Sequence, residues 1–287
     1  MSIEQASGRR SEPAAAPVAV QLTGASVQVG ARTIWRDVDL TVRTGEFVAI
    51  LGPNGVGKST MIKVLLGLQS LSGGSAVVLG RRAGEARHEI GYLPQRRSFD
   101  AGLRIRGIDV VRLGFDGDRW GVPLPLFGRQ RHREAQARIE EVIELVGATG
   151  YATRPIGQIS GGEQQRLLIA QALVRRPRML LLDEPLDSLD LPSQAAVAGL
   201  VADICRQQNM TVMLVAHDVN PVASYLDRVI YLGPGGAAIG APREVITSAT
   251  LSELYGTPIE VLSASDGRLV VVGHPEPPAH HHDRHAH

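Results

Sequence analysis

The chain is poor in the features that mark a secreted or membrane-embedded protein. Its 287 residues include one cysteine, Cys205, so no disulfide can form within the chain, and this scarcity fits a reducing compartment. No apolar run approaches the roughly 20 residues that a membrane-spanning helix needs, and the N-terminus lacks the apolar stretch of a secretion signal. The 30 basic and 29 acidic residues leave a formal charge of +1, so no overall field favours nucleic acid or an anionic membrane. We therefore expect a cytosolic protein that could serve a membrane only from outside it.

The composition is that of a folded α/β protein with loose ends. Hydrophobic residues make up 44% of the chain, enough for one large core, or for one core with a lobe attached. Residues 1–17 are rich in Ala, Ser, Gly and Pro, and residues 274–287 are rich in Pro and His, so we expect both ends to be unstructured. Between them short apolar runs alternate with helical patterns, which predicts a largely parallel sheet in a main domain over 18–241.

A C-terminal extension is expected over 242–273. The segment REVITSATLSELYG (243–256) predicts a helix. The segment IEVLSASDGRLVVV that follows predicts a hairpin-like pair of strands around Asp266 and Gly267. We expect this extension to pack onto the main domain.

A glycine-rich loop stands between a predicted strand, Glu46–Leu51, and a predicted helix, Ser59–Leu68. Its sequence GPNGVGKS matches GxxxxGKS, a pattern whose glycines turn backbone N–H groups inward to cradle phosphate oxygens. Lys58 would place a positive charge on the β and γ phosphates, and the Ser59 hydroxyl could bind magnesium. The strand, turn and helix are the context that this chemistry requires, so we predict a nucleotide site rather than a glycine-rich turn with a stray lysine. Its residues are Gly52, Pro53, Asn54, Gly55, Val56, Gly57, Lys58, Ser59 and Thr60.

Two further apolar strands are followed by polar residues. Met179–Leu182 precedes Asp183 and Glu184, and Val212–Val215 is followed closely by His217. The carboxyl ends of parallel strands meet at one edge of a sheet, where open α/β proteins bind their ligands. We expect Asp183 to hold magnesium through its water shell, Glu184 to orient and polarise the attacking water, and His217 to hydrogen-bond the γ-phosphate. The alternative is that the acidic pair only caps the next turn and that the histidine is structural.

A second glycine loop lies in ISGGEQQR, where Ser160, Gly161 and Gly162 open a predicted helix that runs to Leu173. Two glycines at a helix start form an anion-binding terminus, so the chain holds two phosphate-binding loops. One domain would bring both to a single nucleotide only awkwardly. Two copies placed head to tail could each complete the other's site.

These motifs, in this order, resemble the nucleotide-binding subunits of ABC transporters, with ISGGEQQR in the place of the LSGGQ-type signature. The resemblance runs from about Val20 to Ile239. It implies a P-loop NTPase fold, with a RecA-like core of mostly parallel sheet, an antiparallel β subdomain, and a helical subdomain at about 96–160. It also implies a peripheral protein at the cytoplasmic face of the membrane. Such a subunit pairs with a second copy around two ATP molecules, binds integral permease subunits, and serves a substrate-binding protein indirectly.

The resemblance further implies a role for each matching residue. Gln95 stands at the glutamine that contacts magnesium and senses the γ-phosphate, and Leu186–Asp190 matches the D-loop that crosses the dimer interface. Glu184 falls on the general-base position and His217 on the switch histidine. The implied catalytic residues are Glu184, His217, Gln95 and Lys58, and the implied magnesium ligands are Ser59, Gln95 and Asp183. The implied contacts with nucleotide across the dimer come from Ser160, Gly161, Gly162, Glu163 and Asp190.

One position departs from the family pattern. An aromatic residue commonly stacks on adenine just before the glycine of SVQVG, and this chain has Val29 there. A lost stack costs on the order of 1 kcal/mol. We therefore expect an effect on affinity and on nucleotide preference.

The cargo is expected to be a divalent metal ion, zinc or manganese. The stretches GYLPQRRSFD and DVVRLG resemble importers of that group, and the tail supplies His280, His281, His282, His285 and His287 as zinc ligands, unless its histidines do nothing specific. An iron chelate or cobalamin stays open as another cargo. So do two other classes, an ABC-type ATPase acting on nucleic acid or ribosomes and a metal-binding regulatory protein. We expect no nucleic-acid partner, because the chain has neither fused ATPase halves nor long coiled-coil insertions.

Overall fold

A computed structural model describes residues 16–95, 99–100, 102–116, 129–265, 267 and 269–272. The predicted N-terminal tail up to residue 15 and the histidine-rich tail lie outside the described residues. So do residues 96–98, 101 and 117–128 of the predicted helical subdomain. Among the residues described, no helix is long and apolar enough to cross a bilayer.

A six-stranded sheet forms the centre of the molecule, in the order β10-β9-β3-β8-β7-β6. All neighbours are parallel except β10, which pairs antiparallel with β9. Every residue of β3, β7 and β8 is buried, as expected for apolar strands covered on both faces. The strands are β3 (Phe47–Leu51), β6 (Ile90–Leu93), β7 (Met179–Asp183), β8 (Thr211–Val215), β9 (Arg228–Gly233) and β10 (Gly236–Gly240). The expected mostly parallel sheet is confirmed.

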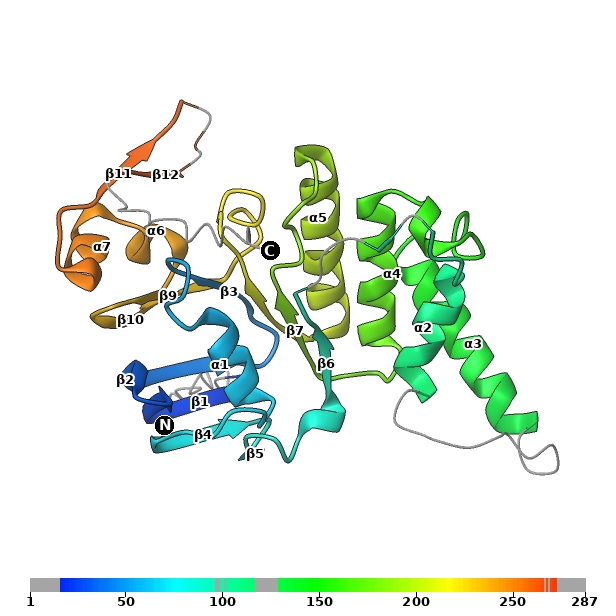
Figure 1. The fold of residues 1–287 in the computed structure, drawn as a ribbon, viewed down its shortest axis with the longest axis horizontal. Helices are drawn as coiled ribbons and strands as arrows, with labels where there is room; N and C mark the ends of the chain where they lie inside the picture. The colour runs from blue at the N-terminus through cyan, green and yellow to red at the C-terminus, as the bar shows by residue number, and fades with distance from the viewer. Residues whose placement is uncertain are drawn as a thin grey trace, which may run out of the picture.

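A second, antiparallel sheet has the order β2-β1-β4-β5 and covers one face of the central sheet together with α1 (Figure 1). Successive side chains of β3 point to opposite faces of the central sheet. Val48 and Ile50 therefore lie in the core between this sheet and the antiparallel sheet with α1, and Phe47 and Ala49 lie in the core on the opposite face. The expected antiparallel β subdomain is thus present. Its elements are β1 (Val18–Val29), β2 (Arg32–Arg43), β4 (Gly73–Val78), β5 (Arg81–Arg82) and α1 (Lys58–Leu65), and the short η1 (Arg87–Glu89) leads into β6.

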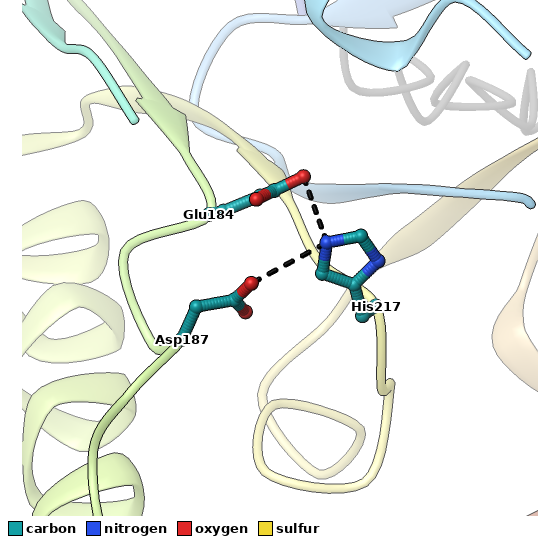
Figure 2. A group of neighbouring side chains, drawn as sticks. All are labelled: Glu184, Asp187 and His217. Atoms are coloured by element: carbon teal, nitrogen blue, oxygen red, sulfur yellow. Dashed lines mark ion pairs between the residues drawn. The ribbon is translucent and has the colours of Figure 1, made fainter. Parts of the chain in front are cut away.

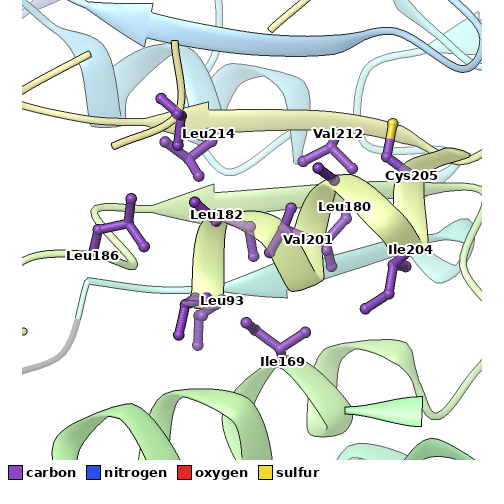
Figure 3. Packing of buried hydrophobic residues seen from close by; sticks show 14 of the residues in the cluster. Leu93, Ile169, Leu180, Leu182, Leu186, Val201, Ile204, Cys205, Val212 and Leu214 are labelled. Atoms are coloured by element: carbon purple, nitrogen blue, oxygen red, sulfur yellow. The ribbon is translucent and has the colours of Figure 1, made fainter. Parts of the chain in front are cut away.

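A helical lobe stands on the far side of α5 from the sheet (Figure 1). It consists of α2 (Gly107–Asp116), α3 (Arg129–Leu145), η2 (Ile156–Gln158) and α4 (Gly161–Leu173), and α5 spans Leu191–Gln208. Figure 3 shows the apolar side chains that join these parts, with Leu180 and Leu182 of β7 near Val201 of α5, and Ile169 of α4 facing Leu93. One continuous core therefore ties the lobe to the sheet.

The C-terminal extension differs from the single helix expected over 243–256. It forms two helices, α6 (Pro242–Val245) and α7 (Ser248–Tyr255), because Ile246 leaves the helical backbone and Thr247 caps the second helix by accepting from the Thr250 amide at 3.2 Å. The expected hairpin is confirmed as β11 (Glu260–Ser263) paired antiparallel with β12 (Leu269–Val272).

A buried arginine holds the C-terminal end of α4. Arg138 of α3 is 8% exposed, and its guanidinium donates to the carbonyl oxygens of Leu173 at 2.8 Å and Val174 at 3.1 Å. It also pairs with the Glu141 carboxylate at 2.7 Å. The Leu173 carbonyl also accepts from the Arg176 amide at 3.0 Å, so at this helix end Arg138 adds a second donor for Leu173 and supplies the hydrogen bond of Val174.

Replacement of Arg138 by Ala should destabilise the protein by about 1–3 kcal/mol, because the Val174 carbonyl loses its donor and the Leu173 carbonyl loses one of two donors. The measurement is equilibrium unfolding in urea. Arg133→Ala on the same helix is the matched control, since Arg133 is exposed, and its effect should stay within about 0.5 kcal/mol. Equal effects of the two variants would contradict this account of the α4 terminus.

Candidate functional site

The glycine-rich loop connects β3 to α1 and depends on its glycines. Gly52 and Gly57 have φ of 138° and 106°, a region that favours glycine. A Cβ added at Gly52 would lie 2.2 Å from the Leu232 carbonyl oxygen, and one at Gly57 would lie 2.4 Å from the Ile34 side chain. The loop can hold this shape only with glycine at both positions.

Lys58 is the buried cation of the loop. It is 5% exposed, and its Nζ donates to the Gly52 carbonyl at 2.8 Å and to the Pro53 carbonyl at 3.2 Å. Burial lowers the pKa of Lys58, while the carboxylates of Glu184, Asp187 and Asp183 oppose that shift. The ammonium is thus held among backbone oxygens at the start of α1, with acidic groups close by.

A cavity of about 180 Å³ opens above the loop. The residues that line it are Ile34, Asn54, Gly55, Gly57, Lys58, Ser59, Thr60 and Glu184. Val29 is absent from this lining and is 49% exposed, whereas Ile34 of β2 supplies an apolar side chain. The cavity therefore joins the phosphate loop to one acidic residue of the neighbouring strand.

Asp183 ends β7 beside the phosphate loop. Its Oδ1 accepts a hydrogen bond from the Ser59 hydroxyl at 3.0 Å, and the residue is only 4% exposed. Burial raises the pKa of Asp183, and the hydrogen bond from Ser59 opposes this. A buried carboxylate next to a hydroxyl is a pair of hard oxygen donors, the ligand chemistry that magnesium prefers, so these residues fit magnesium.

Glu184, His217 and Asp187 converge at the same sheet edge (Figure 2). His217 Nε2 lies 2.8 Å from Glu184 Oε1 and 3.3 Å from Asp187 Oδ2. The Gln95 side-chain amide, just after β6, donates to the other oxygen of Glu184. Burial raises the pKa of Glu184, with His217 as the largest opposing influence. Two side chains from neighbouring loops, Gln95 and His217, thus contact the buried Glu184 carboxylate, and Asp187 joins the group through His217.

Asp187 contacts His217 but was not predicted from the sequence as a site residue. It lies in the segment expected to form the D-loop, yet no individual role was predicted for it. Its position three residues after Glu184 was the available signal, because a turn after the strand can bring the two carboxylates back together. The structure has that turn, with positive φ at Glu184 and Ser188.

The second glycine loop forms a well-capped helix start. The Ser160 hydroxyl accepts from the Glu163 amide at 3.3 Å, and the Glu163 carboxylate accepts from the Ser160 amide at 2.8 Å, a reciprocal capping box. Asp190 caps α5 in a similar way through the Ser193 amide at 2.8 Å. None of residues 160–163 lines the cavity above the phosphate loop, and α4 stands in the helical lobe (Figure 1). One chain thus gathers Lys58, Ser59, Gln95, Asp183, Glu184 and His217, and leaves the Ser160 loop outside that cavity.

The chain resembles known proteins over most of its length. A family model described as ABC transporter matches residues 35–187. The zinc transport system ATP-binding protein TroB of Treponema pallidum is 33% identical over 85% of this chain and 90% of that protein. The manganese transport system ATP-binding protein MntB of Bacillus subtilis is 32% identical over 90% and 99%. The hemin import ATP-binding protein HmuV of Streptomyces coelicolor is 36% identical over 92% and 94%.

Two solved structures of ABC transporter chains are similar to this chain. An inward-facing ABC transporter of the metal-chelate type has a TM-score of 0.71 and 26% identity, with 88% of this chain and 96% of that chain covered. A dimeric ATP-binding cassette in a post-hydrolysis state, bound to ADP and Pi, has a TM-score of 0.63 and 26% identity over 77% and 98%. Both similarities extend over nearly the whole of the known chains.

Removing the buried charge of Asp183 should stabilise the nucleotide-free protein. Because burial raises the folded-state pKa, the ionised carboxylate opposes folding above that pKa, and the cost vanishes as the pH falls below the pKa of the unfolded chain. We expect Asp183→Asn to raise the melting temperature by about 2–4 °C at neutral pH, with a smaller gain in acid. Thermal unfolding with a metal chelator present measures it.

Asp203→Asn is the control for this experiment, because Asp203 is an exposed carboxylate on α5. It should leave the melting temperature unchanged at every pH. A lower melting temperature for Asp183→Asn than for the parent at neutral pH would show that burial of the charge is not costly.

Proposed function

The chain belongs to the ABC transporter family as an ATP-binding, ATP-hydrolysing subunit, and from this premise we propose that it powers the import of a divalent metal ion, zinc or manganese. The observation that carries the cargo proposal is the similarity, over 85–90% of this chain, to ATP-binding proteins named for zinc and manganese transport. The importer would comprise two copies of this chain at the cytoplasmic face, separate membrane permease subunits, and indirectly a substrate-binding protein.

Phosphate binding is assigned to the glycine loop and Lys58. The backbone N–H groups of the loop and the N-terminal end of α1 would face the phosphate oxygens, and Lys58 would exchange its carbonyl contacts for the β and γ phosphates. Ser59, Asp183 and Gln95 would hold magnesium, which supplies charge neutralisation on the phosphates when bound. The support is the 3.0 Å contact of Ser59 with the desolvated Asp183 carboxylate.

Water activation is assigned to Glu184. Its carboxylate lines the phosphate cavity, and burial raises its pKa, which makes it a better proton acceptor than an exposed carboxylate. Gln95 and His217 each contact one of its two oxygens, so its orientation is determined by two neighbouring loops. In the complex with nucleotide, His217 would turn to the γ-phosphate. Catalysis would then depend on positioning and on charge neutralisation.

The Ser160 loop is assigned to the nucleotide of a second copy. Its capped helix start presents N–H groups for an anion, but this loop does not line the cavity of its own chain. In a head-to-tail pair, residues 160–163 and Asp190 of each copy would close on the nucleotide of the other. Hydrolysis would reopen the pair and move the permease.

An iron chelate is the second candidate cargo. The HmuV relative, named for hemin import, is 36% identical over 92% of this chain, and the solved transporter above is of the metal-chelate type. The zinc and manganese relatives are comparably similar. The cargo assay below therefore includes both classes of cargo.

Transport by the reconstituted complex tests the proposal. Proteoliposomes containing the permease, the binding protein and this chain should take up radioactive zinc or manganese with ATP and leave hemin outside.

Glu184→Gln should bind ATP and hold the closed pair but lose turnover and uptake by at least about 100-fold, because the attacking water loses its base. Lys58→Ala should lose ATP binding itself. Hemin uptake without metal uptake would reject the cargo, and normal turnover of Glu184→Gln would reject its role.

Mixed pairs test the shared site. Glu184→Gln impairs the site on its own chain, and Ser160→Arg would impair the site on the partner. Each variant alone should be inactive. An equal mixture should recover about a quarter of parental turnover, because half of the pairs are mixed and each mixed pair keeps one intact site. Turnover no higher than that of the separate variants would contradict the head-to-tail arrangement.

A further inference from the structure

Three potential metal ligands meet at the end of the central sheet, two from the turn after β7 and one from the loop after β8. One ligand atom each from Glu184, Asp187 and His217 lies within 4.8 Å of the others (Figure 2). We propose that this triad is a binding site for a transition-metal cation of the zinc type, separate from the magnesium ligands and open in the nucleotide-free subunit. It is called the acid–histidine triad below.

The spacing of the ligand atoms suits a small tetrahedral ion. Zinc binds imidazole nitrogen and carboxylate oxygen at about 2.0–2.2 Å, so two ligands of a tetrahedral site lie about 3.3 Å apart. His217 Nε2 lies 2.8 Å from Glu184 Oε1 and 3.3 Å from Asp187 Oδ2. The His217–Asp187 pair thus already has the tetrahedral spacing, and the His217–Glu184 pair would open by about half an ångström to admit the ion.

Burial differs among the three ligands in a way that suits reversible binding. The Glu184 side chain is 7% exposed and anchors the triad, whereas those of Asp187 and His217 are about 40% exposed. Asp187 and His217 also line a cavity of about 380 Å³. An ion can reach the triad from that side, and water can fill its fourth position, as in zinc sites with three protein ligands.

The donor set selects against magnesium. Magnesium prefers oxygen ligands in octahedral geometry, which Ser59 and Asp183 offer at the neighbouring position. An imidazole nitrogen with two carboxylates suits zinc or cobalt, and manganese should bind more weakly by the usual order of divalent affinities. The two positions therefore call for different ions although Asp183 and Glu184 are adjacent in the chain.

Occupation of the triad would stop hydrolysis. The ion would take one oxygen of Glu184 and the Nε2 of His217, the two groups assigned above to water and to the γ-phosphate. If the chain energises metal import, which is the proposed function, then zinc accumulating at the cytoplasmic face would slow its own uptake. The binding site itself does not depend on that cargo assignment.

Metal binding tests the triad directly. The full chain is used with its six tail histidines (274, 280–282, 285 and 287) replaced by Gln, so that the tail cannot bind the ion. Without nucleotide, Co²⁺ should produce the visible absorption of a tetrahedral site at one equivalent, and Zn²⁺ should displace it. Asp187→Asn should weaken Zn²⁺ binding at least about tenfold, Asp187→His should restore it, and Asp203→Asn should leave it unchanged.

A second measurement links the site to turnover. With free Zn²⁺ set by a metal buffer and Mg²⁺ and ATP in excess, Zn²⁺ should inhibit the tail-substituted chain, and Asp187→Asn should need at least about tenfold more Zn²⁺ for the same inhibition. Absent Co²⁺ absorption, or equal Zn²⁺ affinity in Asp187→Asn and Asp203→Asn, would overturn the proposal. A failed zinc uptake assay with intact Zn²⁺ binding would instead reject only the cargo.

Discussion

The burial of opposite charges at one edge of the central sheet is the constraint on which the site depends. Lys58 is 5% exposed and Asp183 4% exposed, and each would be costly to bury without a partner of the other sign. Parallel pairing of β3, β8 and β7 brings their carboxyl ends together, so the lysine after β3 lies within Coulombic range of the acids after β7. Burial shifts the pKa of each of Lys58, Asp183 and Glu184 towards its uncharged form, and the opposite charges nearby oppose that shift. A nucleotide with its cation would complete the arrangement.

The separation of the helical lobe from the sheet explains why the cavity above the phosphate loop lacks the Ser160 loop of its own chain. The continuous core through α5 and Ile169 fixes α4 in the lobe, so its capped N-terminal end stays out of the cavity above the phosphate loop. A second copy then becomes the natural source of the missing anion contacts.

The strands and loops at the site were predictable because each carries a strong local pattern. GPNGVGKS requires its glycines for steric reasons, and the apolar runs before Asp183 and His217 are too hydrophobic to lie anywhere but in a buried sheet. The helix expected over 243–256 was wrong in one respect, since it breaks at Ile246. Thr247 caps the start of a second helix, α7, and the periodicity of apolar residues alone does not reveal such a break.

The sequence by itself determined the chemistry that is available: a phosphate loop, an acidic pair, a histidine and a second anion-binding helix start. Each is a local motif that can be recognised from residue types and spacing, without knowing which residues lie near it in space. Only the tertiary structure decided which of these groups touch. It placed Asp187 against His217, gave both oxygens of Glu184 a partner, and kept the Ser160 loop away from Lys58. Such contacts depend on strand order and on the turn after β7, which are set by packing over the whole chain.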